Sequence, residues 1–207
     1  MKDGKKRIYI VWIAAVASLG GFLFGYDTAV ISGTLAFVRT QFGLAAAMEG
    51  WYVSSALVGC IAGVAVAGWL SDKYGRKRIL LLAAILFSIS AIGCAVSGSF
   101  TTLVLYRIIG GMGVGIASML SPLYISEISP PELRGRLVAL YQFSITLGIL
   151  FSFFINARLL DRSIQGLLDN EVLQLIFKGE GWRAMLGMET IPAVLFFILV
   201  TTIPKSP

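Results

Sequence analysis

The sequence predicts an all-α membrane protein, a bundle of six transmembrane helices. Hydrophobic residues make up 57% of the 207-residue chain and charged residues only 14%. Apolar runs long enough to cross a hydrocarbon core of about 30 Å recur along the chain. Lys and Arg gather at the ends of these runs, so the net charge of +6 indicates membrane topology and not a nucleic-acid partner.

We expect spans at about 8–32, 51–70, 79–98, 101–125, 137–157 and 183–203. The first span begins at Ile8 and is not followed by a cleavage-site pattern, so it is predicted to be retained. A basic turn separates the second span from the third. The second and fourth spans carry glycines four residues apart, Gly59 with Gly63 and Gly111 with Gly115, which let helices pack closely in lipid.

Two longer connections are expected on the outer side, at about 33–50 and 158–182. Leu and Ile recur in the second, which favours a short amphipathic helix lying on the membrane surface. Basic residues near the other ends of the spans are Lys2, Lys5, Lys6, Arg7, Lys73, Arg76, Lys77, Arg78, Arg134, Arg136 and Lys205. These are 11 of the 17 Lys and Arg residues, which predicts a multi-pass protein of the inner (plasma) membrane with both termini cytoplasmic.

Three charged side chains fall at one depth within the apolar spans. Asp27, Arg107 and Glu189 each lie about six residues from the outer end of their span, about 9 Å below the boundary. An unpaired charge at such a depth costs roughly 2.5–3.5 kcal/mol, so we expect Arg107 in the bundle interior, between the two acids. A static ion network that only fixes helix packing is the alternative, as is an Asp27 that merely marks a helix end near Gly33.

This set of charges suggests proton coupling. Arginine stays cationic in proteins and can hold one carboxylate ionised. The negative charge of the other acid is then stabilised less by the arginine, so that acid is expected to bind a proton near neutral pH. In this hypothesis Asp27 takes up and releases the proton, Arg107 switches partners, and Glu189 is the standing counter-ion.

The sequence predicts no enzyme, cofactor or metal site. It contains no His, and its two cysteines, Cys60 and Cys94, lie in apolar runs without metal-ligand spacing. The glycine-rich run at 107–115 lies inside an apolar span and lacks the spacing of a nucleotide-binding loop.

Several motifs occur in order between the expected spans: GFLFGYDTAVISG (21–33), GWLSDKYGRKR (68–78), RIIGG (107–111), PLYISE (122–127) and ELRG (132–135). Together they resemble those of the sugar porters of the major facilitator superfamily. The resemblance covers nearly the whole chain but only the first half of a twelve-span transporter. It implies the N-terminal half of a major facilitator fold, a 3+3 inverted repeat, with the C-terminal bundle absent after Pro207.

The resemblance also implies residue roles. The first-span acid, Asp27, is the proton site and pairs with the fourth-span arginine, Arg107. A cytoplasmic gate is implied at Gly68, Asp72, Gly75, Arg76, Glu127 and Arg134. In the family this network holds the inner gate closed; the alternative is that its basic residues only set orientation. Either way, the short turn between two spans needs Gly75.

For the substrate, the resemblance implies contacts from Phe24, Gln142 and Ile145. An intramembrane amide at Gln142 suits a sugar hydroxyl, although interhelical packing explains it as well. The chain departs from the family at two positions. Ile149 stands where the xylose symporters carry a second glutamine, and Lys205 stands where a glutamate is usual.

The function predicted is proton-coupled transport of a monosaccharide by alternating access. The predicted partners are the sugar, a proton, the lipid bilayer, and either a C-terminal half or a second copy of the chain. The alternatives are a proton-independent uniporter and a non-transporting membrane subunit or fragment.

Overall fold

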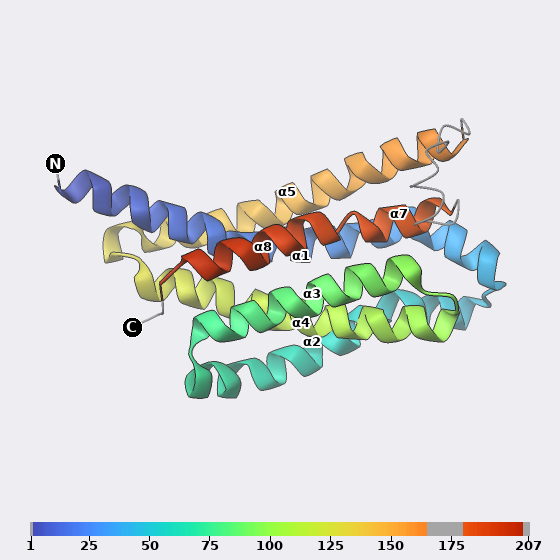
Figure 1. Ribbon diagram of the computed structural model, residues 1–207, viewed down its shortest axis with the longest axis horizontal. Helices are drawn as coiled ribbons and strands as arrows, with labels where there is room; N and C mark the ends of the chain where they lie inside the picture. The colour runs from blue at the N-terminus through green and yellow to red at the C-terminus, as the bar shows by residue number, and fades with distance from the viewer. Residues whose placement is uncertain (1, 165–179, 205–207) are drawn as a thin grey trace.

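The computed structural model describes residues 2–164 and 180–204, and these residues form a long bundle of helices (Figure 1). The helices are α1 (Lys2–Phe42), α2 (Ala46–Tyr74), α3 (Arg76–Val96), α4 (Phe100–Ile128), α5 (Pro131–Ile164), α7 (Gly181–Gly187) and α8 (Thr190–Thr202). Six spans are long and apolar enough to cross a membrane, α7 and α8 together making the sixth. The described part of the chain contains no strand. The predicted all-α, six-span membrane bundle is therefore confirmed.

The first expected connection is wrong, because α1 continues to Phe42 and only residues 43–45 link it to α2. Gly33 does not end the helix but lets α5 approach, since a Cβ there would overlap the Asn156 side chain. The helix ends at Gly43, whose φ of +59° suits glycine, and the Leu44 amide donates to the Arg39 carbonyl at 3.1 Å.

The second expected connection is also shorter than predicted, because α5 runs on to Ile164. Arg158 therefore lies on a helix and not in a loop. The predicted amphipathic surface helix falls on 167–176, outside the described residues. At the other end of the bundle, Gly75 alone joins α2 to α3, with a φ of +88° that confirms the need for glycine in this turn.

The sixth span is interrupted between α7 and α8, at Met188 and Glu189. Backbone bonds tighten to three-residue spacing there, with the Ile191 amide donating to the Met188 carbonyl at 3.2 Å. Pro192 follows and has no amide hydrogen to offer the preceding turn. The interruption places a carboxylate at a break in the helix.

Backbone contact between paired helices shapes the bundle. The glycine stripes predicted on the second and fourth spans face each other, since a Cβ on Gly63 would overlap the Met112 carbonyl and one on Gly115 the Cys60 carbonyl. Helices α1 and α5 pack in the same way at Gly25 and Gly148. A 3+3 repeat matches the first, second and third spans to the fourth, fifth and sixth. Under this match the pair α2·α4 corresponds to the pair α5·α1, and both pairs are in close contact, as an inverted repeat requires.

The end of the bundle opposite to both termini is held by a buried arginine (Figure 1). The Arg183 guanidinium donates to the carbonyls of Ala95, at 3.1 Å, and Ser97, and pairs with Glu180 at 2.6 Å. It thereby closes the end of α3 against the start of α7. The adjacent Trp182 donates its indole N–H to Gln41 on α1 at 2.5 Å.

Candidate functional site

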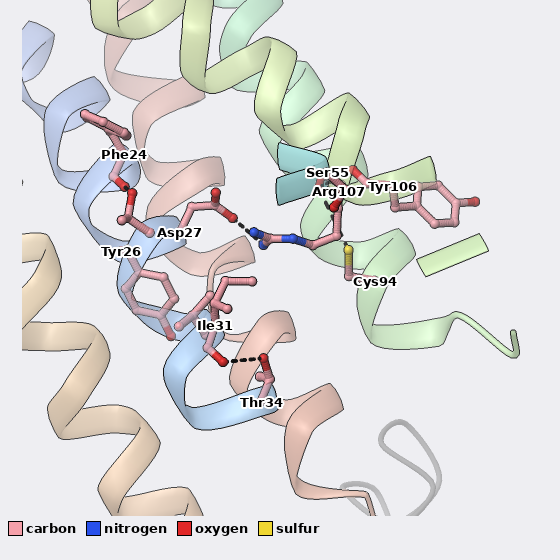
Figure 2. Close-up of polar contacts among 12 residues, drawn as sticks. Phe24, Tyr26, Asp27, Ile31, Thr34, Ser55, Cys94, Tyr106 and Arg107 are labelled. Atoms are coloured by element: carbon pink, nitrogen blue, oxygen red, sulfur yellow. Dashed lines mark hydrogen bonds and ion pairs between the residues drawn. The ribbon is translucent and has the colours of Figure 1, made fainter. Parts of the chain in front are cut away.

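A buried ion pair joins α1 to α4 in the middle of the bundle. The Arg107 guanidinium lies 2.7 Å from the Asp27 carboxylate, and the two side chains are 3% and 11% exposed. Figure 2 shows them pointing toward each other from facing helices. A buried pair with this geometry avoids the cost of two isolated charges, and removing one partner leaves the other uncompensated.

Aromatic and hydroxyl groups surround the arginine. The Tyr52 ring lies 5.9 Å from the Arg107 guanidinium carbon, and the Tyr52 hydroxyl is 2.8 Å from that of Thr34. Tyr52 is fully buried, and Arg107 Nε has no hydrogen-bond partner within residues 2–164 and 180–204. Sequence reasoning missed Tyr52, although a tyrosine at the start of an apolar span is a signal that could have drawn attention to it.

Glu189 lies nearby but does not share the ion pair. It is buried at the break between α7 and α8, within electrostatic range of Asp27 and Arg107. One of its carboxylate oxygens, Oε1, has no hydrogen-bond partner among the residues that the structure describes. Among the described residues, Arg107 forms an ion pair within 4 Å with Asp27 and none with Glu189. The position of Arg107 between the two acids stays a prediction.

A cavity of about 140 Å³ opens beside the ion pair, between α1, α2 and α4. It is lined by Phe24, Asp27, Thr28, Ile31, Val53, Ala56, Leu57, Cys60, Arg107 and Val114. The charged and hydroxyl groups can hold water, while the rest of the wall is mostly apolar. The structure thus brings three residues predicted from the sequence, Phe24, Asp27 and Arg107, to one cavity.

The two remaining predicted substrate contacts lie elsewhere. Gln142 is exposed on α5 and does not line this cavity. Ile145 is half-buried on the same helix, where its backbone carbonyl packs against Gly25. The cavity that Phe24 lines therefore includes neither Gln142 nor Ile145.

A second charged cluster lies at the end of the bundle that holds both termini. Arg76 pairs with Asp72 at 2.7 Å and with Glu127 at 3.1 Å, and it donates to the Ser71 carbonyl at 3.2 Å. One arginine therefore ties α2, α3 and α4 together. Arg134 is exposed and forms no ion pair with any described residue, so Glu127 pairs with Arg76 and not with Arg134.

The chain is similar to known sugar transporters. The family described as "Sugar (and other) transporter" matches residues 13–207. The arabinose-proton symporter of Bacillus subtilis is 44% identical over 199 residues, which cover 96% of this chain and 41% of that protein. The D-xylose-proton symporter of Escherichia coli K12 is 41% identical over 225 residues, covering 96% and 44%.

The fold agrees with these relatives. The solved structure of a proton:xylose symporter of the major facilitator superfamily, bound to 6-bromo-6-deoxy-D-glucose, matches with a TM-score of 0.86 and 41% identity. The match covers 98% of this chain and 46% of that one, its N-terminal half. This chain spans less than half the length of the relatives that it matches. By sequence and by fold, the chain belongs to the sugar transporter family of the major facilitator superfamily.

Proposed function

We propose that this chain forms one bundle of a proton-coupled monosaccharide transporter that works by alternating access. The observation that supports this most directly is the buried Asp27–Arg107 pair at the wall of a cavity. Relatives named as arabinose-proton and D-xylose-proton symporters support the substrate class. The orientation proposed, in an inner membrane with both termini cytoplasmic, follows from the basic residues at that end.

The proton step follows from the geometry of the three charges. Water in the cavity can carry a proton to Asp27, and protonation removes the charge that holds Arg107. Of the described acids, Glu189 then remains in electrostatic range of the arginine, and its Oε1 accepts no hydrogen bond from any of the described residues. When Arg107 exchanges Asp27 for Glu189, protonation of one side chain shifts α4 relative to the α7–α8 break. The helices of the bundle thereby change their arrangement.

The sugar contacts proposed are Phe24, at the cavity, and Gln142 and Ile145, on α5. Gln142 is exposed in this bundle, so its amide is available to a hydroxyl in a pathway completed from outside the chain. Ile149 offers no such hydrogen bond, and the proposal therefore extends to a pentose or hexose and not to xylose in particular.

A second bundle is needed to enclose the pathway. Helices α2 and α5 are the least buried spans, with large exposed side chains such as Leu57, Ile61 and Phe143. We propose that a C-terminal half or a second copy covers these exposed side chains and closes the cavity side. The lipid bilayer surrounds the remaining faces.

Reconstitution tests this function. The chain is placed in liposomes alone, or with the second half of a relative, and uptake of labelled arabinose, xylose and glucose is followed with and without an imposed pH gradient. We expect gradient-driven uptake when a second bundle is present. Uptake by the chain alone would indicate a homodimer, and gradient-independent uptake a uniporter. Failure of uptake in both arrangements would contradict a transport role.

The Arg76 cluster is proposed as a latch that holds the cytoplasmic end closed. Replacing Asp72 with Asn removes one of the two carboxylates that Arg76 contacts across α2, α3 and α4. We expect the transporting protein to shift toward its inward-facing state, because the state with a closed cytoplasmic end loses the ion pair between Arg76 and residue 72. Cys60, at the cavity wall, should then react several-fold faster with a thiol reagent applied from the cytoplasmic side.

Two controls accompany that experiment. Cys94 is replaced by Ser, so that the thiol reagent reacts in this chain only with Cys60. The variant Glu132→Gln removes an exposed carboxylate at the same end that forms no ion pair with a described residue. A Cys60 labelling rate that is the same in Asp72→Asn, Glu132→Gln and the parent would refute the latch.

A further inference from the structure

A groove that the transport mechanism does not use runs along the outside of the bundle, between α1, α5 and α8. It encloses about 330 Å³ and its exposed lining is wholly apolar, with Phe22, Phe151, Ile191 and Leu195 among its walls. It lies on spans that cross the membrane, so hydrocarbon and not water is its natural neighbour.

A second groove continues the first along the later residues of α5. Helix α5 ends at the end of the bundle opposite to both termini (Figure 1). It encloses about 340 Å³ and shares Ile155 and Met188 with the first. Its lining includes Arg158, so the joined grooves lead from an apolar interior to a guanidinium. Arg158 follows Phe151 by seven residues of α5, a rise of about 10 Å along the helix.

The charge at this end is available for binding. Arg158 is exposed, its guanidinium carbon lies 5.1 Å from the Phe154 ring, and it forms no ion pair with any described residue. Asp161 lies one turn farther along α5, outside the lining of either groove. A cation stacked on an aromatic ring at the end of an apolar channel complements an anionic head group.

We propose that the joined grooves bind one anionic phospholipid, with an acyl chain in the apolar groove and its phosphate at Arg158. An acyl chain matches the apolar lining of the first groove, and the lipid phosphate matches the Arg158 guanidinium that lines the second. The first groove is also lined by Tyr26 and Met188, the residues that precede Asp27 and Glu189. A bound acyl chain therefore packs behind the two acids of the proposed proton site, yet its binding is measurable without transport.

Native mass spectrometry of the purified chain tests this proposal. Dioleoylphosphatidylglycerol and dioleoylphosphatidylcholine, which share acyl chains and differ in net charge, are titrated separately. We expect the first bound lipid to favour phosphatidylglycerol by about fivefold, the factor expected for one basic residue near an anionic lipid. Arg158→Gln should abolish this preference, and Ile191→Trp, which fills the apolar groove, should lower retention of both lipids.

Arg39→Gln is the matched control. It removes another exposed arginine, one near the same end of the bundle but on α1 and paired with Glu49 at 3.0 Å. It should keep the preference for phosphatidylglycerol. Equal retention of the two lipids by the parent chain would overturn the proposal, as would an equal loss of preference in Arg39→Gln and Arg158→Gln. A chain dimer that Ile191→Trp dissociates would show that a second copy, and not a lipid, covers the groove.

Discussion

Asp27→Asn is expected to abolish accumulation of sugar against its gradient while sugar exchange across the membrane continues. An asparagine keeps nearly the same shape and accepts a hydrogen bond from Arg107, but it carries no charge and binds no proton. The 2.7 Å ion pair is then permanently broken, as protonation would break it transiently. Coupling is lost, because the bundle no longer has two states that the proton distinguishes.

The measurement compares accumulation and exchange in liposomes that contain the complete transporting assembly. We expect the internal-to-external sugar ratio to fall to about one under an imposed pH gradient, because no free energy of the proton is then transferred. The matched control is Glu49→Gln, which breaks a carboxylate–arginine pair that is exposed to solvent. It should leave accumulation unchanged.

A folding defect must be separated from loss of coupling. Asp27→Asn leaves Arg107 buried with less compensation, so some loss of thermal stability is expected. The double variant Asp27→Asn with Arg107→Gln removes both charges and should regain stability without regaining coupling. Accumulation that persists in the single variant would exclude Asp27 as the proton site.

The second large effect is expected from the glycine stripe between α2 and α4. Gly63→Leu should prevent formation of the folded bundle, because the added Cβ would meet the backbone carbonyl of Met112 and no side chain can move aside. The smaller change Gly63→Ala should cost about 1–3 kcal/mol, the usual range for overpacking. Both act by forcing apart two helices that lie in backbone contact.

Thermal unfolding of the purified variants measures this effect. Gly50→Ala is the control on the same helix, since a Cβ at Gly50 meets no atom within 4 Å. It should leave stability unchanged or raise it slightly, because alanine favours the helix more than glycine does. Opposite signs for the two alanine variants would support close approach, and equal effects would argue that helix propensity alone is being measured.

Some parts of the site were predictable from the sequence. Asp27 and Arg107 stand out because each is a charge within an apolar run, and counting residues from the span ends is enough to place them at one depth. Phe24 was implied only by the resemblance to the sugar porters; it lies on the same helix, three residues before Asp27. The gate arginine Arg76 was predictable as one of a basic cluster, but the sequence left open whether Glu127 pairs with Arg76 or with Arg134.

The sequence by itself determined the membrane class, the number of spans and the contact faces marked by glycine, because hydropathy and helical spacing are properties of short stretches of chain. Only the tertiary structure decided that Arg107 pairs within 4 Å with Asp27 without a second pair to Glu189 among the described residues, that the sixth span breaks at Glu189, and that α1 passes through Gly33. These outcomes depend on how each helix is rotated and where its neighbours stop. Backbone packing across the whole bundle sets both, and no local stretch of sequence contains that information.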